Sequence, residues 1–269
     1  MDENKIAIVA SEGGMSCAYS VGVILGLVEK YNLTTPDIVI GISGSTGTLA
    51  YYVAGQYKSI RNIWENLLSN NKFVNYSRLT RLMDIDYLID EVFKKQDVLD
   101  ISAVKLSPIN FYIAVTNKKT GKTEYFSNKD DIDIFEALRA SSAMPVFFNK
   151  SVIINSNEYI DGGVSSNIQN SINLAKHLGA NKIVAIDNSN NNFQNKFFSR
   201  IYSLFTSTEL RNAVKSNCHT LNKDSGVLLI KPSTKLPIST LDNNRDRIRQ
   251  TIQIGYNDVV ETTLIENFI

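Results

Sequence analysis

Residues 38–45 constrain the fold more than any other part of the chain. Their apolar, β-branched start, Ile-Val-Ile, leads directly into Gly-Ile-Ser-Gly-Ser. Such a run favours a buried strand, and the small residues after it allow a sharp turn into a helix. A serine at the apex of that turn, here Ser43, presents its hydroxyl above the first helical turn. The segment predicts either a serine nucleophile or an ordinary strand-to-helix turn capped by a serine.

A second strand, glycine-rich turn and helix precede this segment. Residues 5–10 predict a short buried strand, and residues 17–30 carry apolar side chains at helical spacing. Gly13, Gly14 and Met15 lie between them. Backbone amides at a helix start can hold a phosphate or the oxyanion of an acyl intermediate. Because the chain has no Gly-x-Gly-x-x-Gly or Gly-Lys-Ser/Thr sequence here, the oxyanion interpretation is favoured over a nucleotide site. A glycine turn needed only for tight packing is the alternative.

A carboxylate and a block of small residues follow later in the chain. Asp161 closes a predicted hairpin beside two glycines, where a carboxylate can act as a base. Residues 140–145, Ala-Ser-Ser-Ala-Met-Pro, end a helix that is predicted to begin near residue 132, because proline cannot continue it.

These segments, in this order, resemble the motifs of the patatin-like phospholipases, and the resemblance runs nearly end to end. Residues 12–23 are similar to the Gly-Gly-Gly-x-Arg-Gly loop of the family, 41–45 to its Gly-x-Ser-x-Gly elbow, 140–145 to its Ala-Ser-x-Ala-x-Pro block and 161–163 to its Asp-Gly-Gly/Ala motif. Residues 254–256, Ile-Gly-Tyr, resemble its closing helix.

The resemblance implies a Ser-Asp dyad in which Ser43 is the nucleophile and Asp161 its base. It implies a lipid acyl hydrolase of the phospholipase A or lysophospholipase type, which acts on phospholipids or other acyl esters through an acyl-enzyme. Gly13, Gly14, Met15 and Gly44 would supply the oxyanion-hole amides. The alternatives are an acyltransferase and a catalytically impaired relative that binds lipid or a protein partner.

Neither histidine is expected to complete a Ser-His-Asp triad. His177 ends a predicted helix at residues 168–177, where a cation favours the helix dipole, and His219 lies on a polar helical stretch. In an α/β-hydrolase the nucleophile also follows several strands, whereas Ser43 follows only the second.

Four positions depart from the family pattern. Glu12, Ser16 and Cys17 replace the first glycine, the arginine and the next glycine of the oxyanion loop. Ser45 replaces the last glycine of the elbow. The lost arginine removes a positive charge beside the developing oxyanion, and Glu12 is expected to add a negative one. Since a missing oxyanion donor costs about 100- to 1000-fold in rate, a slow hydrolase, a specialised one and an inactive relative all fit the sequence.

Composition is typical of a compact intracellular enzyme. With 269 residues, 43% of them hydrophobic, and a formal net charge of +1, the chain suits one α/β domain spanning residues 1–269 and offers no electrostatic basis for binding nucleic acid. Cys17 and Cys218 form neither a disulfide framework nor a metal-ligand spacing, so a reducing cytoplasmic location is expected, with no metal or cofactor. The acidic start and the lack of a long apolar run predict neither a signal peptide nor a membrane span.

The remaining segments alternate between helices and strands. Helices are predicted at 60–68, 86–94, 132–139 and 168–177, and strands at 111–116, 124–126, 152–155, 182–187 and 227–231. This alternation predicts an α/β fold with a mainly parallel central sheet and helices on both faces, which matches the three-layer architecture that the resemblance implies.

Two segments bear on lipid contact. Residues 196–205 place aromatic and aliphatic side chains beside two basic ones, as a helix lying peripherally on a membrane would. The same pattern fits a core-facing helix, which is favoured. Residues 146–148, Val-Phe-Phe, predict either the lining of an acyl pocket or a buried strand.

Overall fold

The computed structural model describes residues 4–78, 81–145, 147–189, 207–217, 224–262, 265–266 and 268. The amphipathic segment 196–205, Cys218 and His219 lie outside the described residues, as does Val146.

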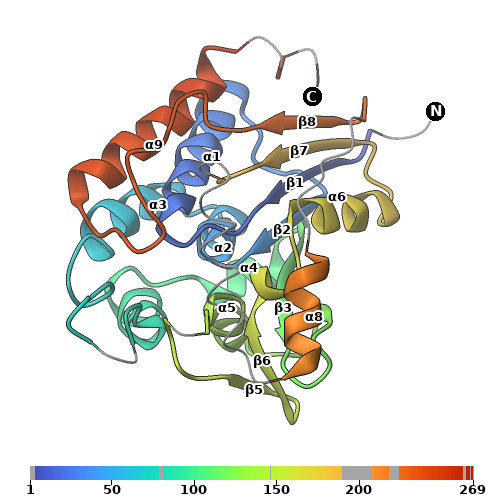
Figure 1. The fold of residues 1–269 in the computed structure, drawn as a ribbon. Coiled ribbons are helices and arrows are strands. Elements are labelled where there is room, and N and C mark those ends of the chain that lie inside the picture. Colours follow the sequence, from blue (N-terminus) through green and yellow to red (C-terminus); the bar gives the residue numbers. More distant parts are fainter. Residues whose placement is uncertain are drawn as a thin grey trace.

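The described strands form one eight-stranded sheet with the order β5-β6-β3-β2-β1-β7-β8, and β4 pairs with β3 off this path (Figure 1). The parallel part consists of β1 (Ile6–Ala10), β2 (Ile38–Ile42), β3 (Asn110–Asn117), β7 (Lys182–Ile186) and β8 (Val227–Ile230). Antiparallel pairing brings in β4 (Thr123–Ser127), β5 (Val152–Ile154) and β6 (Asn157–Asp161). The prediction of a mainly parallel sheet is confirmed.

Both faces of the central strands are buried, which explains why β2 is apolar or glycine at every position. Ile8 and Ala10 belong to the core that includes residues of α1 (Ala18–Tyr31), α2 (Ser45–Val53) and α9 (Arg245–Val260). Ala7 and Val9 point the other way and pack in the core with α6 (Ile168–His177). The sheet therefore lies between two helical layers, as the alternation of segments predicts (Figure 1).

The helical boundaries differ from the predicted ones in several places. The helix predicted at 60–68 consists of α3 (Tyr57–Asn62) followed by a wider π-helix at Ile63–Leu67, which buries Trp64 where its indole can reach α2. A second π-helix occupies Tyr87–Gln96. The helices α4 (Ile101–Leu106), α5 (Ile134–Ser142) and α8 (Thr208–Ser216) and two short 3₁₀-helices, at Gly14–Cys17 and Gly162–Val164, complete the described set.

Residues 147 and 148 do not form the strand that was one of the two predictions for this segment. Phe147 and Phe148 are buried in a turn after α5, where the Phe148 N–H donates to the Met144 carbonyl oxygen at 2.8 Å. None of the described helices is both long and apolar enough to cross a membrane.

The closing helix α9 contacts α1 through the backbone. A Cβ atom on Gly22 would lie 1.9 Å from the Ile252 carbonyl oxygen, and one on Gly255 would lie 2.2 Å from the Tyr19 carbonyl oxygen. The two helices approach this closely only because both positions lack a side chain. Because α1 follows the glycine-rich turn directly, the packing of α9 on α1 also helps to hold that turn in place.

We predict that Gly22→Ala lowers the free energy of unfolding by about 3 kcal/mol, because its methyl group meets backbone that cannot move aside. Gly26→Ala is the matched control, since its Cβ would come within 2.9 Å of the Val259 side chain but no nearer than 3.4 Å to the backbone, at the Tyr256 carbonyl oxygen. There the gain in helix propensity, about 1 kcal/mol, offsets the small rearrangement. Urea denaturation measures both variants, and equal losses would contradict the backbone contact.

Candidate active site

Ser43 lies in the sharp turn between β2 and α2. Its φ is +56°, a left-handed conformation that costs a non-glycine residue about 1–2 kcal/mol. The Ser43 N–H donates to Ser141 Oγ at 3.1 Å, and that hydroxyl donates to the Ala114 carbonyl oxygen at 2.7 Å. The end of α5 therefore holds the strained turn against β3. Strain that the surrounding structure maintains in this way is typical of functional sites.

Ser45, which stands where the motif has its last glycine, faces away from the cavity. Its Oγ accepts the Ile42 N–H at 3.1 Å and donates to the Ile42 carbonyl oxygen at 2.9 Å. The side chain is fully buried and 3.2 Å from the Ala10 carbonyl oxygen. The hydroxyl of Ser45 therefore links the turn to β1 and β2.

Asp161 ends β6 and lies opposite Ser43. Ser43 Oγ donates to Asp161 Oδ2 at 2.6 Å, and the Gly163 N–H donates to Oδ1 at 2.7 Å. The Asp161 N–H donates to the Ala143 carbonyl oxygen at 3.0 Å, so the small-residue block after α5 fixes both partners. Burial raises the pKa of Asp161 to about 7, although the two hydrogen bonds to the carboxylate oppose this increase; the charge of Glu12 adds to it.

The glycine-rich loop passes beside this pair. A Cβ on Gly44 would lie 2.8 Å from the Gly14 carbonyl oxygen, so the loop touches the start of α2. Within the described part of the chain, the N–H groups of Gly13, Gly14 and Gly44 have no hydrogen-bond acceptor. The Met15 N–H, in contrast, donates to the Thr240 carbonyl oxygen at 3.0 Å. Of the four amides predicted for an oxyanion hole, that of Met15 is therefore already engaged.

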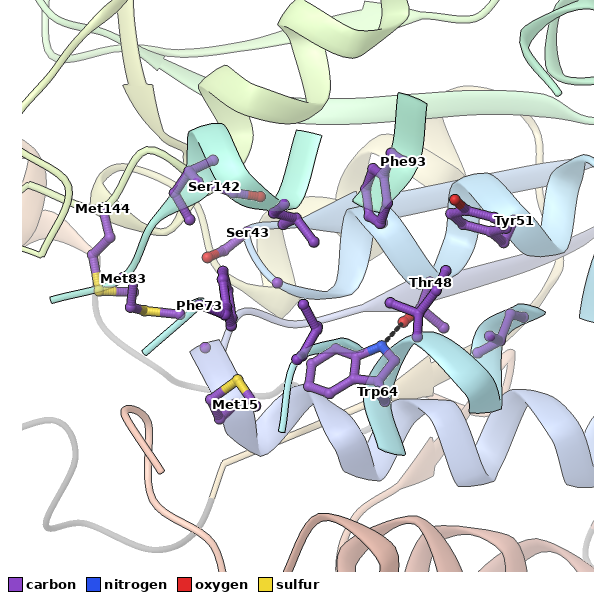
Figure 2. A pocket seen from close by; sticks show the side chains of 18 residues that line it. Met15, Ser43, Thr48, Tyr51, Trp64, Phe73, Met83, Phe93, Ser142 and Met144 are labelled. Atoms are coloured by element: carbon purple, nitrogen blue, oxygen red, sulfur yellow. Dashed lines mark hydrogen bonds between the residues drawn. The ribbon is translucent and has the colours of Figure 1, made fainter. Parts of the chain in front are cut away.

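A cavity adjoins Ser43. Its eighteen lining residues include no charged side chain, and Figure 2 shows Ser43 between a group of aromatic side chains and a group of methionines. Of the aromatic lining residues, Tyr51 comes from α2, Trp64 and Phe93 come from the two π-helices, and Phe73 comes from the loop between those helices. Phe147 and Phe148 are not among the lining residues.

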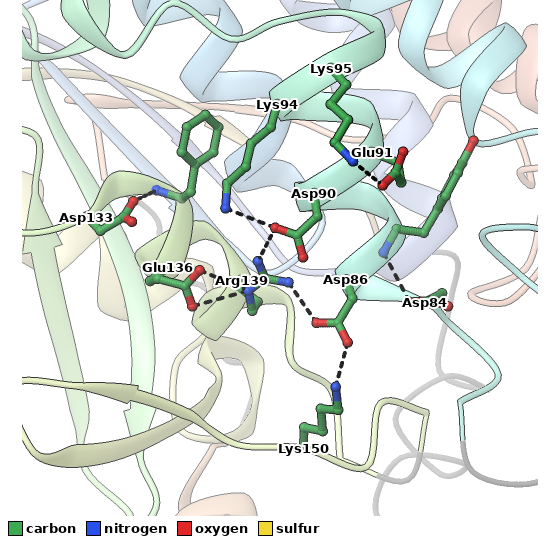
Figure 3. A network of polar contacts seen from close by, with 12 residues as sticks. Asp84, Asp86, Asp90, Glu91, Lys94, Lys95, Asp133, Glu136, Arg139 and Lys150 are labelled. Atoms are coloured by element: carbon green, nitrogen blue, oxygen red, sulfur yellow. Dashed lines mark hydrogen bonds and ion pairs between the residues drawn. The ribbon is translucent and has the colours of Figure 1, made fainter.

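An ion network holds one wall of this cavity (Figure 3). Arg139 of α5 donates to Asp86 Oδ1 and to Asp90 Oδ1, each at 2.7 Å, and to Glu136 at 3.2 Å. Its side chain is only 10% exposed. These contacts join α5, which positions Ser43 and Asp161, to the π-helix at Tyr87–Gln96 that supplies part of the lining.

The chain is similar to known proteins in sequence and in fold. The chain matches the sequence model of the family "Patatin-like phospholipase" over residues 11–176, which is more than half of its length. The chain belongs to this family. It is 25% identical to the uncharacterized protein YjjU of Escherichia coli (strain K12) over 245 residues, which cover 87% of this chain and 67% of that protein.

The fold is also similar to that of VipD from Legionella pneumophila, known from a crystal structure. The TM-score is 0.60 with 14% sequence identity, and the match covers 98% of this chain and 67% of VipD. Membership in the patatin-like phospholipase family supports hydrolysis of lipid acyl esters at the level of the family.

The departures from the patatin-like motif occupy a crowded part of the structure. Ser16 and Cys17 are fully buried, and burial raises the pKa of the Cys17 thiol well above its usual range. An arginine therefore does not fit at position 16 without rearrangement, and the serine there is part of the packing.

Glu12, in place of the first glycine of the patatin-like loop, lies next to Asp161. A Cβ on Gly163 would come within 3.1 Å of Glu12 Cβ and Cγ and of Asp161 Oδ1. Burial raises the pKa of Glu12 to about 8; a hydrogen bond from its own backbone opposes this and the charge of Asp187 adds to it. At neutral pH Glu12 therefore retains its proton, and the negative charge expected from the sequence develops only at alkaline pH.

The histidine His177 is exposed on the last turn of α6, in the helical layer across the sheet from α2. It is therefore not part of the Ser43 site. No cluster of three or more His, Cys, Asp or Glu side chains suited to a metal ion occurs among the described residues.

We predict that Asp161→Asn changes how stability depends on pH. The raised pKa means that folded Asp161 keeps a proton which the unfolded chain releases above about pH 4. The free energy of unfolding then falls by about 1.4 kcal/mol per pH unit from this group as the pH rises toward 7. Urea titrations at several pH values between about pH 5 and pH 7 give the free energy of unfolding as a function of pH. The slope of this dependence should be shallower by that amount in the variant than in the wild type. An unchanged slope would show that Asp161 titrates normally.

Proposed function

We propose that this protein is a serine acyl hydrolase that cleaves lipid esters through an acyl-enzyme on Ser43, with Asp161 as the base. The observation that carries the proposal is the 2.6 Å hydrogen bond from Ser43 Oγ to Asp161 Oδ2 beside an uncharged cavity. A nucleophile and base within this distance, with the base held by a third group, form the arrangement that covalent catalysis requires. Here the third group is the Gly163 N–H.

In the acylation step, Ser43 Oγ attacks the carbonyl carbon of the ester while its proton passes to Asp161 Oδ2. The carbonyl oxygen becomes an oxyanion, for which the N–H groups of Gly13, Gly14 and Gly44 are the available donors. When the tetrahedral intermediate collapses, the bond to the leaving alcohol breaks and Asp161 returns the proton to that alcohol. Ser43 then carries the acyl group.

Deacylation repeats these steps with water. Asp161 accepts a proton from the water molecule, whose oxygen attacks the acyl carbon, and returns the proton to Ser43 Oγ when the carboxylic acid leaves. A pKa near 7 suits this double role, because Asp161 is then ionised in part of the molecules and its conjugate acid is strong enough to protonate the leaving group.

The lining of the cavity favours a lipid substrate. Apolar and aromatic side chains bind an acyl chain by removing it from water, and the cavity offers no charged group to a phosphate or an amine. A polar head group therefore stays outside the cavity. An acyltransferase would use the same acyl-enzyme with an alcohol in place of water, and analysis of products with glycerol added distinguishes the two.

A second candidate function is lipid binding without turnover. It is favoured by the engaged Met15 N–H, which leaves fewer free donors around the oxyanion. Measurement of hydrolysis separates the two candidates, because a binding protein retains the ester intact.

We predict that Ser43→Ala and Asp161→Asn each lower kcat for a soluble acyl ester by at least about 100-fold, since each removes a group that acts in the chemical step. His177→Ala should keep most of the activity, and it is the control for an α/β-hydrolase triad. Circular dichroism checks that the variants fold. Full activity in a folded Asp161→Asn variant would overturn the assignment of the base.

We also predict a bell-shaped dependence of kcat/KM on pH. Activity rises as Asp161 ionises near pH 7 and falls as Glu12 ionises near pH 8, because a second negative charge then opposes the developing oxyanion. In Glu12→Gln the alkaline fall should disappear while the acid limb remains. If the alkaline limb persists in that variant, Glu12 is not its source.

A further inference from the structure

One face of α2 forms a slot that begins at Ser43. Gly44, Gly47, Thr48 and Tyr51 all line the cavity, and their spacing places them on a single side of the helix. Gly44 and Gly47 have no side chain and that of Thr48 is small, whereas Tyr51 is large. The cavity therefore follows α2 for two helical turns away from the nucleophile and meets a bulky side chain at its end.

Two aromatic contacts close the far end of the slot. The Tyr51 ring packs edge-to-face on Phe93, with ring centroids 5.2 Å apart, and the Tyr51 hydroxyl donates to the Asp97 carbonyl oxygen. Phe93 itself packs over Gly47, one helical turn before Tyr51, because a Cβ on Gly47 would lie 2.8 Å from Phe93 Cζ. Phe93 therefore borders the slot from the side and supports the Tyr51 ring at its end. Both ends of the Tyr51 side chain are thus fixed, so this wall does not yield easily to a longer ligand.

The side chains along the slot are mostly apolar, and the Thr48 hydroxyl among them already has a hydrogen-bond partner. Trp64 Nε1 donates to Thr48 Oγ1 at 3.0 Å, which occupies the only hydroxyl on this face of α2 before Tyr51. In Figure 2, Trp64 and Phe93 lie on one side of Ser43, and Met83 and Met144 lie on the other. On the aromatic side of Ser43 the rigid rings give the slot a defined length. On the other side, the methionine side chains adapt to ligands of differing shape.

The helix sets the length of the slot. From Gly44 to Tyr51 α2 rises about 10 Å, at 1.5 Å per residue. An extended chain of single bonds advances about 1.2 Å per bond, so roughly eight carbons fit between Ser43 and the aromatic wall.

We propose that this slot is a medium-chain acyl site that takes a straight acyl group of about eight carbons, and that Tyr51 and Phe93 set this length. The leaving alcohol then lies on the methionine side of Ser43. This inference rests on the proposed acyl hydrolase function, and the experiment below separates the failure of one from the failure of the other.

The first measurement is kcat/KM for straight-chain p-nitrophenyl esters of about two to sixteen acyl carbons. We expect a rise of about fourfold per methylene up to an optimum near eight carbons, followed by a fall. A profile that keeps rising to the longest chain would overturn the slot. The binding measurement described below detects a ligand in the slot without turnover. An absence of ester hydrolysis would therefore contradict the proposed hydrolase function and leave the slot to be tested by binding.

The second measurement uses variants of the wall. Tyr51→Leu should move the optimum to chains longer by two or more carbons, and Phe93→Leu should do the same if Tyr51→Leu does not fold. Tyr52→Leu is the matched control, because Tyr52 is the next residue of α2, is buried, donates its hydroxyl to the Leu33 carbonyl oxygen at 2.6 Å and does not line the cavity. The proposal would be overturned if the optimal chain length does not change in folded Tyr51→Leu and Phe93→Leu. It would also be overturned if the optimal chain length shifts equally in Tyr52→Leu.

The third measurement is independent of catalysis. Calorimetry of Ser43→Ala with neutral straight-chain methyl ketones of increasing length should show affinity rising to about the same length and then levelling or falling, with the break moved to longer ketones when Tyr51→Leu is added. Affinity that rises steadily with chain length in both proteins would reject the aromatic wall even in a protein that hydrolyses no ester.

Discussion

The hydrogen bond between Ser43 Oγ and Asp161 Oδ2 is the contact on which the rest of the site depends. It joins the turn after β2 to the end of β6, two strands on either side of β3. The small-residue block at the end of α5 makes this possible, because Ser141 accepts the Ser43 N–H and Ala143 accepts the Asp161 N–H. One short segment thus fixes the backbone of both partners, and the ion contacts of Arg139 fix that segment against the cavity wall.

Burial of its two carboxyl groups determines the acid–base behaviour of the site. Asp161 and Glu12 are two carboxyl groups that border Gly163 in a region with little water, so each holds its proton to a higher pH than usual. The same low polarity strengthens a hydrogen bond to an oxyanion and favours an acyl chain in the neighbouring cavity. The departures at Glu12 and Ser16 therefore do not place a permanent charge beside Ser43 at neutral pH.

The sequence predicted the parts of the site that depend on local structure. Ser43 follows a strand, Asp161 ends one, and each precedes a glycine; such patterns are visible over a few residues. The cavity could not be predicted in this way, because Trp64 and Phe93 have the same helical spacing as ordinary core residues. The engagement of the Met15 N–H was also invisible, since its acceptor, Thr240, is far away in the chain.

We propose that the strained turn makes Ser43, and no other serine, the nucleophile. Treating the folded protein with a fluorophosphonate probe and mapping the adduct by peptide mass spectrometry tests this assignment. We expect an adduct on Ser43 that forms much more slowly in Asp161→Asn, because the probe needs the same proton acceptor as an ester. An adduct on Ser45 with Ser43 unmodified, or no adduct on the folded protein, would contradict it.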